Sequence, residues 1–308
     1  TLSPLLSAAK MSPLKIAIQL IAVLALINAC AAFVSTSQNG LVSSPKFALS
    51  SVLSPVSQKG CARRLCMNGD IEWTSVKVVE NTAAAEGSKS IIIQPSSTIA
   101  DSYVNPGQYV QMKTGDGKPG FYAIANAPGR GKDGSFEFLV KETDSNGWLT
   151  NAQPGAQLDM SAALGKGFAI DEHFEGFKYD FPLQHIFMFA AGSGIAPIRA
   201  ALESDTLKIE GGRTATLYYG ARNAAQMAYA EKFDAWQERG VNIVPVLSQP
   251  EAGWGGRRGY VQDALKEDLV PAPRNCGVLL CGMKGMVEDV KYVFTTAGAF
   301  EGRLLQNF

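Results

Sequence analysis

The sequence predicts a two-domain protein in which an antiparallel β-barrel is followed by a doubly wound parallel α/β domain. Up to about residue 161, short β-rich segments are separated by turn residues at even intervals. From about residue 182, apolar segments alternate with segments of helical character, as in a parallel sheet. A Gly-Ser-Gly turn joins the first of these apolar segments to its helix. These three observations together predict the fold class.

Short segments of alternating or β-branched residues make up the first half of the body. Turn residues separate them, for example at 105–107 and 154–155. Many short strands at even spacing are typical of a small antiparallel barrel. We expect the strands over 73–80, 90–94, 108–113, 121–126, 135–141 and 157–160.

The second half alternates strands with helices. Sheets wound in this way bind ligands at the carboxyl ends of their strands, so the turns at these ends are expected to face one cleft. The strands are expected over 185–191, 214–219, 241–247 and 277–281. The helices are expected over 196–204, 226–238, 260–266 and 283–296.

The first strand–helix turn of the second half has the composition of a phosphate-binding turn. Gly192, Ser193 and Gly194 follow an apolar run, and Pro197 suits the first turn of a helix. Glycine lets the backbone approach a phosphate, and the helix start offers free N–H groups and the positive end of its dipole. The alternative is a tight turn with a structural role alone.

The composition is that of a globular protein with room for two domains. The chain has 308 residues, of which 46% are hydrophobic and 18% are charged. Its formal net charge is zero, but residues 70–308 hold 22 basic and 28 acidic residues, a net charge of −6. Nothing in this part of the chain favours a nucleic-acid partner.

Residues 1–69 have the character of a targeting presequence, because they contain six basic and no acidic residues. A lysine, an apolar run and small residues predict a signal peptide over about 11–32. Serine-rich, basic residues over about 33–69 predict a transit peptide. The apolar run is too short to span a bilayer comfortably, so we expect no stable membrane span in the mature protein; a retained anchor is the alternative.

This presequence resembles the bipartite presequences of algae with complex plastids, which implies the plastid stroma. The alternative is a serine-rich linker on a secreted protein. Only Cys276 and Cys281 lie outside the presequence, and they do not form a disulfide framework, which argues against secretion. We expect the barrel over 70–180 and the α/β domain over 181–308.

Four segments resemble the ferredoxin–NADP reductase superfamily and occur in the same order. They read Pro-Gly-Gln-Tyr-Val at 106–110, Ala-Leu-Gly-Lys-Gly-Phe at 163–168, Gly-Ser-Gly-Ile-Ala-Pro at 192–197 and Cys-Gly-Met-Lys-Gly-Met at 281–286. Further runs at 217–223, 244–250 and 259–262 are similar to a plant and algal plastid branch first met as a fruit-expressed sequence.

The resemblance implies FAD on the barrel, NAD(P)H on the α/β domain and hydride transfer between them. The electron acceptor is not written in the sequence. In the superfamily, an Arg-x-Tyr-Ser-x-x-Ser strand meets the flavin; here Gly120 replaces the arginine, and Tyr122, Ala123 and Asn126 occupy the other positions. Losing the guanidinium removes a bidentate phosphate clamp. Tyr122 is expected to contact the flavin, unless it is an ordinary strand aromatic.

Further positions are implied by the same resemblance. Asn146 stands where a helix start meets the FAD diphosphate, with capping alone as the alternative. Arg222 follows a strand and is expected near the adenosine ribose or a 2′-phosphate, unless it is simply solvated, so NADH and NADPH both stay open.

Cys281 is the expected catalytic position, beside the nicotinamide ring, unless it is a buried structural cysteine. Gly282 and Met286 belong to the same cofactor-binding motif. Phe308 is expected to screen the flavin ring, unless the last residues form a strand.

We therefore expect an NAD(P)H-dependent flavin oxidoreductase. The alternative is a non-catalytic reductase fold that senses nucleotides or binds a partner, which the changes at Gly120 and Ala123 favour. No metal motif is present in the sequence, and His173 and His185 lack a partner pattern.

Overall fold

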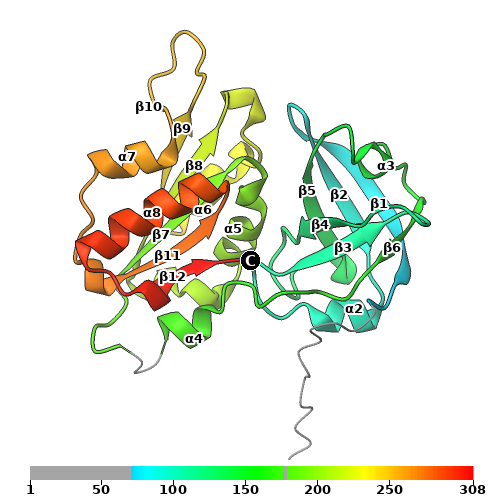
Figure 1. The fold of residues 1–308 in the computed structure, drawn as a ribbon, viewed down its shortest axis with the longest axis horizontal. Helices are drawn as coiled ribbons and strands as arrows, with labels where there is room; N and C mark the ends of the chain where they lie inside the picture. The colour runs from blue at the N-terminus through cyan, green and yellow to red at the C-terminus, as the bar shows by residue number, and fades with distance from the viewer. Residues whose placement is uncertain (1–70, 176–178, 308) are drawn as a thin grey trace, which may run out of the picture. The chain divides into compact units, whose positions relative to one another are not determined.

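The computed structural model describes residues 71–175 and 179–307. The predicted presequence lies outside the described residues. The described chain forms an antiparallel sheet, followed by a parallel sheet flanked by helices (Figure 1). This order confirms the predicted fold class.

The first sheet has six strands in the order β4-β3-β6-β1-β2-β5. Its edge strands β4 and β5 come together where the Ala125 N–H donates to the Glu137 carbonyl at 2.8 Å, so the sheet closes into the predicted barrel. The strands are β1 (Thr74–Ala85), β2 (Ser88–Gln94), β3 (Tyr109–Lys113), β4 (Gly120–Ala123), β5 (Phe136–Lys141) and β6 (Gln157–Met160). The short helices α2 (Ser97–Ser102) and α3 (Gly147–Thr150) accompany them.

The barrel core follows the period of two that a half-buried strand requires. Ile91 and Ile93 of β2 are fully buried, as are Val110 and Met112 of β3. Alternate residues of these strands point outwards, so one face of each strand fills the interior of the barrel.

The second sheet has six parallel strands in the order β10-β9-β8-β7-β11-β12. The chain runs outwards from β7 to β10 on one side and returns to place β11 on the other side of β7. The strand order therefore reverses between β7 and β11, which makes the ends of these strands a topological switch point. The strands are β7 (His185–Ala191), β8 (Thr214–Ala221), β9 (Val241–Leu247), β10 (Arg257–Arg258), β11 (Cys276–Cys281) and β12 (Leu304–Gln306).

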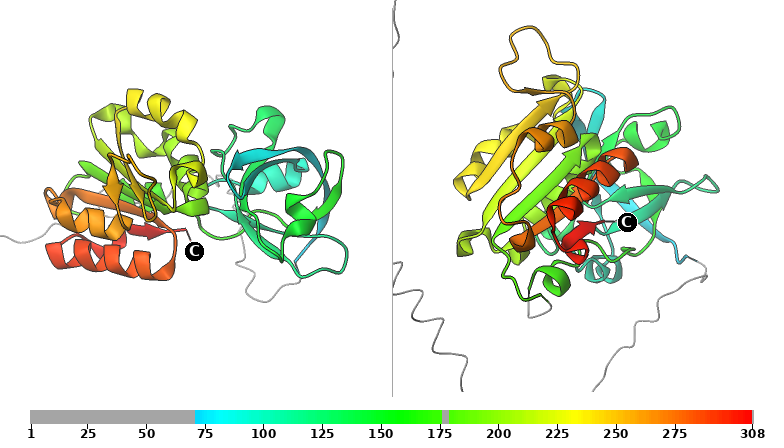
Figure 2. Two further views of the ribbon diagram at one scale, coloured as in Figure 1. Left: turned by 90° about the horizontal axis from the view of Figure 1, so that it is seen from above. Right: turned by 60° about the vertical axis from the view of Figure 1, so that its left-hand side comes forward.

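Helices cover both faces of the parallel sheet. In the left view of Figure 2, α5 (Ile195–Leu202) and α6 (Phe233–Glu238) lie on one face, and α7 (Val261–Glu267) and α8 (Lys284–Ala297) lie on the other. Each face has its own buried apolar cluster. The short helix α4 (Ile170–Phe174) precedes this sheet. The doubly wound arrangement is confirmed.

The predicted helix over 226–238 is largely wrong, because within this range only α6 (Phe233–Glu238) is α-helical. Tyr229 adopts a left-handed backbone conformation with φ of 62°, which interrupts a helix. The N–H of Ala228 donates instead to the Tyr219 hydroxyl at 3.1 Å. The burial of Ala228 and Tyr229 in the core thus outweighs the helix propensity of this segment.

A largely buried ion pair joins the barrel to the α/β domain; the side chains of Arg199 and Glu137 are 7% and 20% exposed. Arg199 of α5 is 6% exposed, and its Nη1 donates to Glu137 Oε1 of β5 at 2.5 Å. Glu137 Oε1 also accepts hydrogen bonds from Ser90 at 3.2 Å and from Tyr229 at 3.3 Å. Burial opposes the Arg199 charge, but the hydrogen bond to Glu137 and the electrostatic attraction of Tyr229, Glu137 and Glu203 together outweigh it and raise the pKa of Arg199.

A second link joins the tip of the β1–β2 hairpin to the α/β domain. The Glu86 N–H donates to the Ala225 carbonyl at 2.9 Å, and the Asn223 amide donates to the Glu86 carboxylate at 3.4 Å. Two separate strands of the barrel, β5 and the hairpin end of β1, are thus attached to the second domain.

Replacing Arg199 with methionine keeps much of its volume but leaves the Glu137 carboxylate without its cation. We expect the free energy of unfolding to fall by about 3 kcal/mol, because removing one partner of a buried pair strands the other charge. Urea denaturation measures the loss, and the double variant R199M/E137Q should recover part of it. A single-variant loss below about 0.5 kcal/mol, the level of an exposed pair, would contradict this assignment.

Candidate functional site

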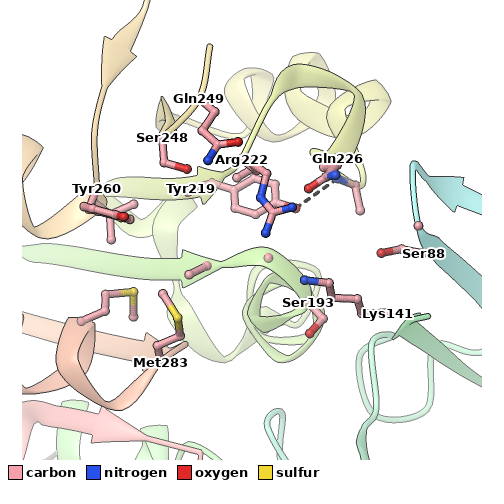
Figure 3. A pocket seen from close by; sticks show the side chains of 18 of the residues that line it. Ser88, Lys141, Ser193, Tyr219, Arg222, Gln226, Ser248, Gln249, Tyr260 and Met283 are labelled. Atoms are coloured by element: carbon pink, nitrogen blue, oxygen red, sulfur yellow. Dashed lines mark hydrogen bonds between the residues drawn. The ribbon is translucent and has the colours of Figure 1, made fainter. Parts of the chain in front are cut away.

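A cleft of about 540 Å³ lies at the carboxyl ends of the parallel strands. One wall comes from the ends of β7, β8 and β9, and the other comes from the barrel, at the β1–β2 hairpin and the end of β5. Figure 3 draws the side chains of 18 lining residues and labels Ser88, Lys141, Ser193, Tyr219, Arg222, Gln226, Ser248, Gln249, Tyr260 and Met283. The cleft thus begins at the switch point where the fold favours a ligand.

The predicted phosphate-binding turn forms the floor of this cleft. Gly192 has φ of 55°, and a Cβ added there would meet nothing within 4 Å, so its backbone is open to a ligand. Within the described residues no side chain caps α5, which follows the turn directly and contains Pro197 in its first turn. Open glycine backbone beside an uncapped helix start suits an anionic group.

Gly194 fixes this turn against the end of β11. A Cβ at Gly194 would lie 2.3 Å from the Cys281 carbonyl oxygen and 3.3 Å from its Sγ. Only glycine permits this approach of two backbones. The structure therefore places the turn from Gly192 to Gly194 beside Cys281.

Two basic side chains reach the cleft from opposite walls. Arg222 follows β8 and Lys141 ends β5, and both are exposed. Figure 3 shows Lys141 extending from the barrel towards the turn that holds Ser193. Sequence reasoning missed Lys141, because its only signal was its place at the end of a predicted barrel strand.

Cys281 ends β11 and is 6% exposed. Burial raises the pKa of its thiol to about 12, although a hydrogen bond from Asn307 opposes part of this rise. The thiol therefore stays protonated at neutral pH and is a weak nucleophile. Its neighbour Gly282 accommodates Met286, whose Cε would lie 2.6 Å from an added Cβ, and Met286 lines the cleft.

The barrel strand predicted to meet the flavin has an unexpected internal contact. Tyr122 is half-buried, packs against the barrel core, and meets Trp148 edge-on with ring centroids 6.4 Å apart. A Cβ added to Gly120 would lie 2.5 Å from the Tyr122 hydroxyl oxygen. Tyr122 thus lies across the position from which the superfamily's arginine projects, and burial raises the pKa of Tyr122.

The structure gives the two predicted asparagines local roles. Asn126 donates to the Ser135 carbonyl at 3.2 Å and accepts from the Glu137 N–H at 2.8 Å, so its amide is engaged within the barrel. Asn146 stands before α3 without a side-chain cap; its amide accepts from the Thr143 N–H and donates to the Lys141 carbonyl. The predicted capping role of Asn146 is therefore wrong, because its side chain closes the preceding turn.

Ala123 is half-buried on β4, opposite Tyr109 in the strand register, and offers no polar side chain to a cofactor. The expected flavin contact of Phe308 lies outside the described residues. Among the described residues, no three histidine, cysteine or acidic side chains gather as a metal site, and no helix is both long enough and apolar enough to cross a bilayer.

Comparisons with known proteins agree with this architecture. Residues 188–292 match the family model of the oxidoreductase NAD-binding domain. The fruit protein pKIWI502 of Actinidia deliciosa is 30% identical over 246 residues, which cover 76% of each chain. The Na(+)-translocating NADH-quinone reductase of Methylococcus capsulatus has a component that is 29% identical over 162 residues, which cover 50% of this chain and 36% of that component.

Solved structures share the whole two-domain fold. A ferredoxin NADP+ reductase from Neisseria gonorrhoeae with bound FAD and NADP has a TM-score of 0.62 at 19% identity, covering 76% of this chain and 97% of its own. The Amycolatopsis cytochrome P450 reductase GcoB has a TM-score of 0.63 at 24% identity, covering 77% and 70%. These neighbours show the fold, and the matched family model describes an NAD-binding domain.

Replacing Gly194 with alanine should damage the phosphate-binding turn. The new Cβ would meet a backbone oxygen that cannot move aside, so we expect a loss of about 2–3 kcal/mol in the free energy of unfolding. Gly192→Ala is the matched control, since it meets open space and should lose only about 1 kcal/mol for its left-handed backbone. Equal losses in the two variants, measured by thermal or urea denaturation, would contradict the close approach to Cys281.

The two buried thiols should make stability depend on pH in the alkaline range. Burial raises the pKa of both Cys276 and Cys281 to about 12, from an ordinary value near 9. The stability that the two neutral thiols contribute is present in full below about pH 9. Between about pH 9 and 12 the thiols ionise in the unfolded chain but not in the folded one, so the free energy of unfolding falls by up to about 1.4 kcal/mol per pH unit for each thiol. Urea denaturation at several pH values should show a shallower decline for the double variant C276A/C281A than for the wild type. Parallel curves would contradict the raised pKa values.

Proposed function

Because this chain belongs to the ferredoxin–NADP reductase superfamily of FAD/NAD(P)-binding oxidoreductases, in the branch of the fruit protein pKIWI502, we propose that it is an NAD(P)H-dependent flavin oxidoreductase of the plastid stroma. The observation that carries the proposal is the cleft at the switch point, floored by an open glycine turn and closed by the barrel. Such a cleft can hold a dinucleotide against a second cofactor on the barrel.

The residues of the cleft fit a nicotinamide dinucleotide. The turn from Gly192 to Gly194 would hold the diphosphate, with Lys141 and Arg222 supplying positive charge. The adenosine half would lie towards the ends of β8 and β9, near Gln249. Arg222 suits either the adenosine ribose or a 2′-phosphate, so both coenzymes belong in the test.

The barrel fits FAD in part. Tyr122 offers a half-buried aromatic ring beside Ala123, but the strand supplies no cation at Gly120 for a diphosphate. When bound, FAD would accept a hydride from the nicotinamide and pass electrons onwards. Since the charged clamp is missing, we expect this chain to hold FAD less tightly than relatives that keep the arginine.

The protein's own contribution is placement and protection. The glycine turn and the basic side chains orient the coenzyme, and the two domain links hold the barrel wall at a fixed distance from it. The neutral Cys281 thiol can pack against a reacting ring without competing as a nucleophile. Hydride transfer itself requires no acid or base from the chain.

We further propose that the electron acceptor is a diffusible flavin, a quinone or a haem protein. The net charge of −6 over residues 70–308 gives no support to a basic docking face for an acidic carrier such as ferredoxin. The name of the Methylococcus capsulatus relative supports a quinone as one candidate to test. The stromal location rests on the character of residues 1–69 alone.

A second candidate function is a reductase fold without turnover, which senses nucleotides or binds a partner. It is favoured by one observation, the Tyr122 ring lying across Gly120 where relatives place a phosphate-binding arginine. In that case the α/β cleft would still bind a dinucleotide.

Anaerobic titration of the purified protein separates the two functions. We expect a yellow protein, or one that turns yellow on adding FAD, whose flavin absorbance is bleached by NADH or NADPH. The coenzyme that bleaches it at the lower concentration is the preferred one. A protein that takes up no FAD, or that holds FAD which neither coenzyme bleaches, would contradict the oxidoreductase proposal and support the second function.

A further inference from the structure

Asn307 is a buried amide without an ordinary hydrogen-bond partner. Residue Asn307 is 2% exposed, and among the described residues its Oδ1 and Nδ2 meet no partner with normal hydrogen-bond geometry; the contact of its amide with the Cys281 thiol falls outside that geometry. Burying such a group unpaired costs on the order of 1–3 kcal/mol, and native proteins rarely accept this cost without a reason. A ligand that offers both a donor and an acceptor would satisfy both atoms.

The strand register places Asn307 beside Cys281. In the parallel pair of β11 and β12, Leu279 lies opposite Leu305 and Leu280 lies opposite Gln306, so the next pair is Cys281 and Asn307. Side chains alternate between the two faces of a sheet. Leu305 and Cys281 belong to the cluster on the α5 face, so Asn307 lies on that face as well.

This position adjoins the phosphate-binding turn. Gly194 approaches Cys281 so closely that only glycine fits, and Asn307 is the next residue across the sheet. Residues that suit adenosine lie at the ends of β8 and β9, on one side of the turn. A dinucleotide whose diphosphate rests on the turn would therefore place its other base on the opposite side, at the ends of β11 and β12.

We propose that the Asn307 amide binds the carboxamide of the nicotinamide ring and sets the direction in which the ring faces. Two primary amides can pair through two reciprocal hydrogen bonds, which satisfies both unpartnered atoms of Asn307 at once. The inference rests on the proposed function and assigns to it a coenzyme-binding residue. The pyrimidine edge of a flavin carries a similar donor–acceptor pair, so the experiment must distinguish the two rings.

Access to this buried amide requires a small movement of β12. This strand is three residues long, lies at the edge of the sheet and pairs with β11 alone. A short edge strand shifts at low free-energy cost, so the ring can reach Asn307 without disturbing the core of the sheet.

The variant Asn307→Leu removes both polar groups but keeps the shape of the side chain. Calorimetry should compare its affinity for NAD+ and NADP+ with its affinity for ADP-ribose and 2′-phospho-ADP-ribose, which lack the nicotinamide. We expect about tenfold weaker binding of the coenzyme that the wild type prefers, as for the loss of one or two hydrogen bonds, and unchanged binding of the matching fragment. Gln306→Leu, one residue earlier on the other face, is the control and should change neither affinity.

The wild type supplies an independent measurement. An analogue with an acetyl group in place of the carboxamide, 3-acetylpyridine adenine dinucleotide (or its 2′-phosphate), lacks the N–H donors and should bind the wild type more weakly than the natural coenzyme. Asn307→Leu should bind the two equally. Because an apolar group replaces an unpaired amide, its melting temperature should not fall.

Three results would overturn the inference while leaving the proposed function intact: unchanged coenzyme affinity in Asn307→Leu, equal weakening of coenzyme and fragment, or a loss of bound FAD with coenzyme affinity retained. The last result would assign the amide to the flavin. A wild type that binds neither NAD+ nor NADP+ would instead overturn the proposed function and the inference together.

Discussion

The buried ion pair between Arg199 and Glu137 is the contact on which the candidate site depends. The cleft has one wall on the parallel sheet and one on the barrel. Its width therefore depends on the contacts that join the two domains, of which this ion pair is one. Glu137 accepts three hydrogen bonds on one carboxylate oxygen, from Arg199 and Tyr229 of the α/β domain and from Ser90 of the barrel. A largely buried charge with this many donors favours the one arrangement that keeps them all, which gives the two domains a defined separation.

Much of the fold can be predicted from local patterns, because alternation marks the barrel strands and continuous apolar runs mark the parallel ones. The strands at His185–Ala191 and Val241–Leu247 match their predicted bounds. Tyr229 breaks the predicted helix because its burial is decided by tertiary packing. The side chains of Asn126 and Asn146 turn to nearby backbone groups, and 62 residues separate Glu137 from Arg199, so no local pattern reveals these contacts.

The cofactor sites differ in how much of them the sequence reveals. A glycine turn can be recognised from the residue types alone. The turn from Gly192 to Gly194 could therefore be identified in the sequence, and in the structure it lies beside Cys281. The flavin strand depends on the direction of side chains, and there the structure adds the packing of Tyr122 across Gly120. The conformation of Tyr122 therefore requires glycine at position 120. The same packing explains why this strand has no arginine for a phosphate: its side chain would clash with the Tyr122 ring.

The link between Glu86 and Ala225 has a consequence for the kinetics of coenzyme exchange. It ties the hairpin to the second domain at the rim of the cleft, while Arg199 ties β5 to it at another point. With two attachments, the walls cannot swing apart as rigid bodies unless a backbone hydrogen bond also breaks. Entry and release at the mouth of the cleft then depend on the rapid rotamer changes of exposed side chains such as Lys141 and Arg222, on a picosecond-to-nanosecond scale, and deeper in the cleft on the local movement of β12, and not on slow domain opening.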